Sequence, residues 1–269
     1  MSRCLIVGVL NSTPDSFSDG GQFRSVEEAV EAGVRMAGDG ADWIDVGGES
    51  TRPGAKTVGE TEEQMRVLPV IEGLRKRLRS DVLISVDTYR ASTARAALAA
   101  GARVVNDISG GLLDPDILEV TAEARGKIVL GHLRGRPSTM MEAISFEDVV
   151  HEVADELGEQ IKAARKAGCE EVWADPGIGF GKALEHNVAL LRGVAPLRAS
   201  LGVPLMVGVS RKSFIGQITG KPVAERVFGT AGAVAAAVLA GASAVRVHDV
   251  GPMRDVVRVA EALAAGEPT

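Results

Sequence analysis

Short apolar runs alternate with longer amphipathic stretches from one end of the chain to the other. The runs are rich in Val, Ile and Leu, which is typical of parallel strands buried on both faces. Between them, apolar residues recur at helical spacing, and one such stripe consists of Val149, Val153, Leu157 and Ile161. The pattern predicts eight strands with helices between them, at residues 4–9, 43–46, 82–86, 103–106, 127–131, 172–174, 205–209 and 244–247.

Local signals indicate where the helices begin and end. The tetrapeptides SVEE from Ser25, TEEQ from Thr61 and SFED from Ser145 have the pattern of capping boxes, of which SFED is the weaker. At the other end, a glycine stands shortly before the next strand in four places, and glycine is the usual left-handed residue after a helix. These glycines are Gly40, Gly101, Gly168 and Gly241.

Eight strand–helix units in about 250 residues predict an α/β fold of the (β/α)8 TIM-barrel type. A doubly wound open sheet is the alternative, but no GxGxxG sequence follows the first strand. No linker or low-complexity segment divides the chain, so we expect a single domain over residues 1–269.

Composition narrows the classes of function. The 269 residues are 45% hydrophobic, enough for one large core, and the formal net charge is -6. Binding to nucleic acid or an anionic membrane requires a basic face, so neither is expected. The apolar runs are too short to span a bilayer, and the first strand starts too early to leave room for a signal peptide. Cys4 and Cys169 show no metal-ligand spacing. We expect a soluble cytoplasmic protein.

Polar or charged residues follow nearly every predicted strand. A single Asp or Asn there is more often a turn former or helix cap than a functional residue. In a TIM barrel, however, the carboxyl ends of all strands meet at one mouth, where the active site forms. The coincidence therefore predicts a site there. In chain order the residues are Asn11; Glu49, Ser50, Thr51 and Arg52; Asp87; Asn106 and Asp107; His132; Asp175; Ser210, Arg211, Lys212 and Ser213; and Arg246, His248 and Asp249.

These residues fall into two groups. Asp87, Asn106 and Asp175 suit a flat heterocycle with several N–H donors, because a carboxylate accepts two parallel hydrogen bonds. A basic group follows the last two strands, where such barrels often bind phosphate. It comprises Arg211, Lys212, Arg246 and His248, with Arg52 and Asn11 able to join it. The sequence thus predicts a phosphorylated ligand with a polar ring. His132 and His248 follow no zinc motif.

Two polar, glycine-containing segments, residues 8–21 and 47–60, leave the predicted mouth. Loops of this character over a barrel mouth commonly act as lids that order on ligand and exclude water. Two lids suit a reaction whose intermediate must be shielded from water.

Eight segments together resemble dihydropteroate synthase. They are LNSTPDSFSDGG, GGESTRPGA, SVDTY, VNDISGG, GHLRGRPSTM, DPGIGFGK, GVSRKSFIG and RVHDV, in this order from the first predicted strand to the last. Each segment alone is a weak signal, but the set covers essentially the whole chain and is highly specific.

The resemblance implies a transferase of folate biosynthesis and a sulfonamide target. Enzymes of this family join 6-hydroxymethyl-7,8-dihydropterin pyrophosphate to para-aminobenzoate, giving 7,8-dihydropteroate and pyrophosphate. The implied path is SN1-like: Mg2+ and basic groups draw off pyrophosphate, and the amine attacks a pterin-stabilised cation. A homodimer is also implied.

The resemblance further implies roles for individual residues. Asp87, Asn106, Asp175 and Lys212 would hold the pterin, with Arg246 against its ring. Asn11 would ligate Mg2+, while Arg52, Arg246 and His248 would hold the pyrophosphate. The para-aminobenzoate pocket would be formed by Phe17, Thr51, Pro53, Phe180, Lys212 and Ser213. Asp19, on the first lid, would stabilise the cation.

Three positions depart from the family pattern. Gly131-His132-Leu133 stands where the family usually reads like Met-His-Met, and Ile178 stands where Phe is frequent. We expect Leu133 to replace one apolar wall by another and Gly131 to loosen the local packing.

Three alternative functions are considered from the sequence. A pterin-dependent methyltransferase would share the barrel and the pterin residues but would not need the pyrophosphate group. A paralogue that binds pterin without turnover would show selective loss of Asn11, Arg52 or His248, and all three are present. A scaffolding protein would not need so many polar strand ends.

Overall fold

The computed structural model describes residues 3–12, 25–50, 57–142 and 144–265. Its eight parallel strands follow the order β6-β5-β4-β3-β2-β1-β8-β7, and a bridge between Ala174 and Leu205 joins the two outer strands. The sheet therefore closes into a TIM barrel, as predicted. The strands are β1 (Leu5–Asn11), β2 (Trp43–Gly47), β3 (Leu83–Asp87), β4 (Val104–Asp107), β5 (Lys127–Gly131), β6 (Glu171–Asp175), β7 (Met206–Gly208) and β8 (Ala244–Val247).

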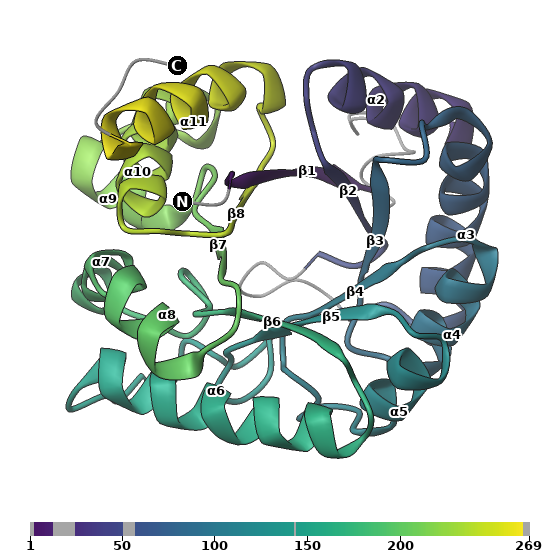
Figure 1. Ribbon diagram of the computed structural model, residues 1–269, viewed down its shortest axis with the longest axis horizontal. Coiled ribbons are helices and arrows are strands. Elements are labelled where there is room, and N and C mark those ends of the chain that lie inside the picture. The colour runs from purple at the N-terminus through teal and green to yellow at the C-terminus, as the bar shows by residue number, and fades with distance from the viewer. Residues whose placement is uncertain (1–2, 13–24, 51–56, 143, 266–269) are drawn as a thin grey trace.

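Helices surround the ring of strands (Figure 1). In the described part of the chain they are α2 (Val26–Gly38), α3 (Glu60–Arg77), α4 (Ala91–Ala100), α5 (Asp116–Glu123), α6 (Val149–Lys166), α7 (Leu184–Arg192), α8 (Val194–Leu201), α9 (Ser213–Thr219), the 3-10 helix η1 (Val223–Glu225), α10 (Val227–Leu239) and α11 (Val250–Ala265). No helix among these is long and apolar enough to cross a membrane.

The core has two layers, which explains the continuous apolar character of the strands. The larger layer lies between the strands and the helices. A smaller cluster fills the inside of the barrel, where the rings of Trp43 and Trp173 meet edge to face with their centroids 5.0 Å apart. Because side chains alternate along a strand, inward residues beyond this plug point toward the mouth. The plug is thus the floor beneath the candidate site.

The signals for helix ends had mixed success. Ser25 caps α2, where its Oγ accepts a hydrogen bond from the Glu28 amide at 3.2 Å. All four predicted glycines have positive φ, between 89° and 127°. The other two boxes were wrong: α3 begins after Gly59, with Thr61 already inside the helix, and Asp148 caps α6 instead of Ser145.

Candidate active site

Arg246 on β8 joins two acidic side chains inside the barrel mouth. Its Nε donates to Asp45 Oδ2 and its Nη2 to Asp87 Oδ2, both at 2.6 Å. Burial lowers the pKa of Arg246, but these carboxylates outweigh burial and raise it above its usual value. Burial raises the pKa of Asp87 to about 7, against the lowering effect of the guanidinium. The predicted residues Asp87 and Arg246 thus form one ionic unit.

Asp45 completes this unit, although the sequence pattern does not predict it. It is fully buried on β2, and its Oδ2 also accepts a hydrogen bond from Asn106 Nδ2 at 2.9 Å. Its Oδ1 has no hydrogen-bond partner within the described ranges. The available signal was a carboxylate in the middle of the apolar strand WIDVG, since a buried charge requires a partner.

Asp175 and Lys212 meet on the other side of the mouth. Asp175 ends β6, and its Oδ1 accepts a hydrogen bond from the Gly177 amide at 2.7 Å. Burial raises the pKa of Asp175, while Lys212 and Arg246 oppose this effect. Lys212 Nζ donates to the Ile178 carbonyl and lies 4.6 Å from the centroid of the Phe180 ring. Burial lowers the pKa of Lys212 to about 8.

A cavity of about 20 Å³ lies between these side chains. A space of this size holds little more than a water molecule. A ring-shaped ligand therefore requires part of the lining, such as the side chains of Lys212 and Phe180, to move aside. The cavity is lined by Asp87, Asn106, Ile108, Gly131, Asp175, Gly177, Phe180, Gly208, Lys212 and Arg246.

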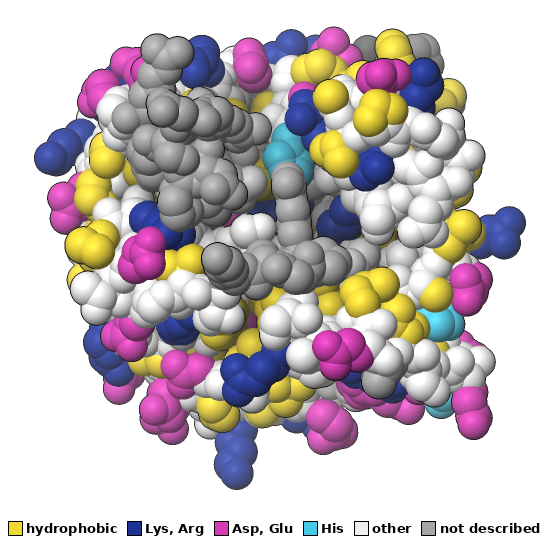
Figure 2. All heavy atoms as spheres, turned by 180° about the vertical axis from the view of Figure 1, so that it is seen from behind, with side chains coloured by type: hydrophobic (Ala, Val, Ile, Leu, Met, Phe, Trp, Pro, Cys, Tyr) yellow, Lys and Arg dark blue, Asp and Glu magenta, His cyan; other side chains and the backbone are white. Residues whose placement is uncertain are grey.

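The structure brings together only some of the basic residues that were predicted to bind an anion. His248, half-buried after β8, has its Nδ1 3.0 Å from Ser210 Oγ. Arg211 is not available as predicted, because its Nε and Nη2 form a two-pronged ion pair with Asp249 at 3.0 and 2.6 Å. Figure 2 shows basic side chains and a histidine around the hollow centre of one face.

Asn11 ends β1 close to Asp87. Asn11 Oδ1 and Asp87 Oδ2 each lie 3.6 Å from the point where a Cβ on Gly47 would stand. Within the described ranges, no three His, Cys, Asp or Glu side chains form a metal-binding group. Mg2+ is usually held by one or two protein oxygens together with substrate phosphates. The Asn11 oxygen beside a carboxylate fits that arrangement.

Behind the cavity lies a buried chain of polar groups. Lys182 Nζ donates to His132 Nδ1 and to the Phe180 carbonyl, each at 3.0 Å. On its other side, the His132 ring donates through Nε2 to Glu156 at 3.0 Å. Burial lowers the pKa of Lys182 to about 7 and that of His132 to about 4. His132, predicted at the mouth, is instead a buried support with both ring nitrogens engaged.

Two further carboxylates that were predicted at strand ends form hydrogen bonds that hold neighbouring loops in place. Asp107 accepts hydrogen bonds from the amides of Ser109 and Gly111, at 2.8 and 2.6 Å. Glu49 Oε2 pairs with Arg90 at 2.8 Å, and its Oε1 accepts from the Tyr89 hydroxyl at 3.0 Å. Asp107 and Glu49 therefore have the structural role that is usual for a polar residue after a strand.

The departures from the family pattern also have structural explanations. A Cβ on Gly131 would stand 2.7 Å from Ile108 Cα and 2.8 Å from its carbonyl oxygen. The expected loosening was therefore wrong, because the Ile108 backbone occupies the space. Leu133 packs with Ile108 and Phe180 as an apolar wall, as expected, while Ile178 is fully buried in the outer core.

The remaining predicted residues are only partly accounted for. Ser213 begins α9 with an exposed side chain and does not line the cavity. Five predicted residues lie outside the described residues: Phe17, Asp19, Thr51, Arg52 and Pro53.

Comparison with known proteins defines the class. The pattern of a family described as pterin binding enzyme matches residues 7–248, from β1 to the end of β8. The chain is therefore a pterin-binding enzyme built on a TIM barrel.

Relatives define the family more narrowly. Dihydropteroate synthase of Synechocystis sp. is 48% identical over 264 residues, covering 97% of this chain and 90% of the relative. The enzyme of Escherichia coli K12 is 44% identical over 264 residues, covering 97% and 92%. The chain belongs to the dihydropteroate synthase family, whose members are transferases of folate synthesis.

Solved structures agree. Yersinia pestis dihydropteroate synthase in complex with a sulfonamide drug has a TM-score of 0.92 and 39% identity, over 98% of this chain and 95% of that one. The enzyme of Xanthomonas albilineans in complex with 7,8-dihydropteroate has a TM-score of 0.86 and 41% identity, over 98% and 95%. These relatives favour a synthase over the methyltransferase alternative.

Proposed function

We propose that this chain condenses 6-hydroxymethyl-7,8-dihydropterin pyrophosphate with para-aminobenzoate to give 7,8-dihydropteroate and pyrophosphate. The observation that carries this proposal is the meeting of Asp87, Asn106 and Asp175 with Lys212 and Arg246 around one cavity. Carboxylates and amides are suited to the N–H groups of a pterin, and the two cations are suited to its ring oxygen and the leaving group.

The pterin is held by the acceptor side of the cavity. Asp175 faces the pyrimidine edge, where its carboxylate accepts two parallel hydrogen bonds. Asp45 keeps Asn106 and Arg246 in place through Oδ2, so that neither rotates away from the ring. Lys212 leaves its contact with the Ile178 carbonyl when the ring enters.

The leaving group is assigned to residues that lie near or follow the carboxyl ends of β1, β2 and β8 in the sequence. Arg246, His248 and Arg52 bind the pyrophosphate, and stabilisation of developing charge is usually the largest catalytic contribution. Asn11 would hold Mg2+ together with the phosphate oxygens, and the bound ion would neutralise part of their charge. The bond from the methylene carbon to pyrophosphate breaks before the amine attacks, so no nucleophilic protein residue is required.

The second substrate enters beside Phe180 and Lys212. We assign Phe17, Thr51, Pro53 and Ser213 to the same pocket and Asp19 to stabilisation of the cation, on the basis of the family resemblance. The ring of Phe180 packs with Leu133 and Ile108, which gives para-aminobenzoate an apolar wall.

The deciding experiment measures pyrophosphate release from the purified chain with the pterin pyrophosphate and Mg2+, with and without para-aminobenzoate. Release that requires the amine, together with formation of dihydropteroate, would support the synthase. Pterin binding without product would instead identify a non-catalytic paralogue.

The pterin site has its own test in Asp175→Ala. Loss of a charged acceptor for two ring donors should weaken pterin binding by about 2–3 kcal/mol or more. Calorimetry with the pterin pyrophosphate measures this loss, and Asp255→Ala on the exposed side of α11 is the matched control. Unchanged pterin affinity in the Asp175 variant would refute the assignment.

We also propose that the whole chain, residues 1–269, is one domain and acts as a cytoplasmic homodimer. The support for the dimer is the set of exposed apolar side chains on the neighbouring helices α9, α10 and α11. These are Ile218, Phe228, Val259 and Leu263, here called the apolar helix face. Cys4 and Cys169, both buried free thiols, are compatible with a reducing compartment.

A further inference from the structure

A second and larger cavity lies at the opposite end of the barrel from the candidate active site. Its volume is about 600 Å³, within the range of small-molecule sites. The walls come from the start of β1, the turns before β2 and β8, and helices α8, α10 and α11. These are the amino ends of the strands, whereas the catalytic mouth lies at their carboxyl ends. The lining residues Ile6, Val238 and Val257 place the cavity in the outer layer of the core, between the strands and the helices.

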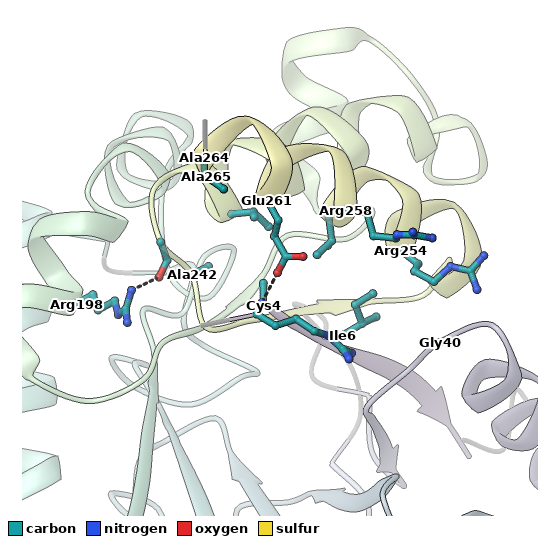
Figure 3. Close-up of a pocket in the computed structure, with 14 residues that line it drawn as sticks. Cys4, Ile6, Gly40, Arg198, Ala242, Arg254, Arg258, Glu261, Ala264 and Ala265 are labelled. Atoms are coloured by element: carbon teal, nitrogen blue, oxygen red, sulfur yellow. Dashed lines mark hydrogen bonds between the residues drawn. The ribbon is translucent and has the colours of Figure 1, made fainter. Parts of the chain in front are cut away.

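Basic side chains dominate the polar part of this cavity. Four arginines line it against one acidic residue, Glu261, and they are Arg3, Arg198, Arg254 and Arg258. Glu261 Oε1 accepts a hydrogen bond from the Cys4 amide at 2.5 Å, which ties the carboxylate to the chain at the start of β1 (Figure 3). The cavity is therefore locally positive in a chain whose formal net charge is -6.

The arginines are only partly neutralised. Arg3 pairs with Asp42 at 2.5 Å, and Arg254 Nε lies 3.6 Å from the exposed Asp255. Arg198 donates to the Gly241 carbonyl at 3.1 Å, which is a neutral partner. Within the described part of the chain, no ion pair involves Arg198 or Arg258, and Arg254 Nε is buried without a hydrogen-bond partner.

Two of these side chains stand one helical turn apart on α11. Arg254 and Arg258 are at positions i and i+4, where like charges destabilise a helix. Gly40 leaves room for the first of them, because a Cβ there would stand 2.7 Å from Arg254 Cδ. An anion between the two guanidinium groups would relieve the repulsion.

The rest of the wall is apolar. Ile6 on β1, Val238 on α10 and Val257 on α11 line the cavity together with small alanine and glycine positions. A ligand with a hydrocarbon or aromatic body would bury apolar surface there. We propose that this cavity is a binding site for a small organic dianion, with its charged group at Arg254 and Arg258 and its apolar body against Ile6 and Val257.

Calorimetry with phenyl phosphate as the probe tests this site in the full-length chain. Wild type should bind it, and Arg254→Gln/Arg258→Gln should weaken binding by about tenfold or more. Ala264→Trp, which fills the cavity without removing charge, should have the same effect. Arg165→Gln on the exposed side of α6 is the matched control and should bind like wild type.

Further probes define the ligand class. Phthalate should bind if carboxylates serve as well as phosphate, and inorganic phosphate should bind about tenfold more weakly than phenyl phosphate because it lacks the apolar body. A crystal structure with phenyl phosphate should show it between β1 and α11. Equal affinity in wild type, the double arginine variant and Ala264→Trp would overturn the proposal, as would no wild-type binding below about 1 mM.

Discussion

At the scale of single residues, Gly131 shows how a missing side chain can be a requirement. The Ile108 backbone fills the space that a Cβ would take, with its Cα 2.7 Å from that point. We predict that Gly131→Ala destabilises the fold by about 1–3 kcal/mol, because backbone cannot yield as a flexible side chain can. Urea unfolding measures the difference.

The matched control for this prediction is Gly158→Ala in the middle of α6. No atom lies within 4 Å of a Cβ at Gly158, so this change should stabilise the helix by about 0.5–1 kcal/mol. If both alanine variants changed stability alike, the close approach of Ile108 would not be a constraint.

Lys182 gives a prediction about pH. Burial lowers its pKa to about 7 in the folded chain, against a reference of 10.5. Between these two pH values the unfolded chain binds more protons at this residue than the folded chain does. The stability of wild type relative to Lys182→Met should therefore rise with pH across this window, by up to about 1.4 kcal/mol per pH unit.

Denaturant titrations of both proteins from pH 7 to pH 10 provide the measurement. Lys166→Met, on the exposed side of α6, is the control and should differ from wild type by a constant amount. A flat difference for Lys182→Met would mean that this buried amine does not titrate in the window. Lys182→Met should also raise the KM for para-aminobenzoate, because the ammonium group anchors the Phe180 carbonyl.

Some residues of the candidate site could be predicted from the sequence, and others could not. Asp87, Asn106 and Asp175 were predicted because each stands at or next to the end of a strand, and strand ends converge in a barrel. Asp45 lies two residues before the end of its strand and Lys182 follows a glycine-rich loop, so position alone gave no signal for either. Their importance depends on partners from distant segments, such as Arg246 and His132.

At the scale of elements, the start of α6 allows two candidate capping residues, Asp148 and Ser145, to be compared. Asp148 Oδ1 accepts hydrogen bonds from the amides of Val150 and His151, both at 3.1 Å. We predict that Asp148→Ala destabilises the protein by about 1 kcal/mol. Ser145→Ala, the residue favoured by the sequence, should have almost no effect. Thermal unfolding of the two variants measures this, and a larger loss in Ser145→Ala would reverse the assignment.

Strands were easier to predict than helix starts for a physical reason. A buried parallel strand is apolar at most positions, so its limits coincide with the change in composition. Capping boxes recur by chance in acidic segments: TEEQ lies within the first turns of α3, where acidic residues also favour the helix dipole. The glycine signals succeeded because positive φ strongly selects glycine, as at Gly101 with a φ of 127°.

At the scale of the whole molecule, the closed barrel has two ends, one with the catalytic mouth and the other with the arginine-lined cavity. The mouth could be predicted because polar residues at many strand ends had one common explanation. The cavity at the other end could not, since its arginines come from the start of the chain, α8 and α11 with no shared spacing. Contacts between α10, α11 and β1 bring these segments together, as Figure 1 shows for the first and last parts of the chain.

The apolar helix face makes a prediction about assembly. Phe228, at the start of α10, is 88% exposed, and Ile218, Val259 and Leu263 are each 61% or more exposed. A stable interface buries about 800 Å² on each partner, and a large aromatic side chain near its centre contributes strongly. We therefore expect a dimer that Phe228→Asp converts to monomers.

Sedimentation velocity at micromolar concentration distinguishes the outcomes. Met65→Asp is the matched control, since Met65 is 64% exposed on α3, across the barrel from α10 (Figure 1). Wild type and the Met65 variant should sediment as dimers, while the Phe228 variant should sediment as a folded monomer with an unchanged circular dichroism spectrum. Wild type sedimenting as a monomer would refute the dimer, and a dimeric Phe228→Asp would place the interface on another face.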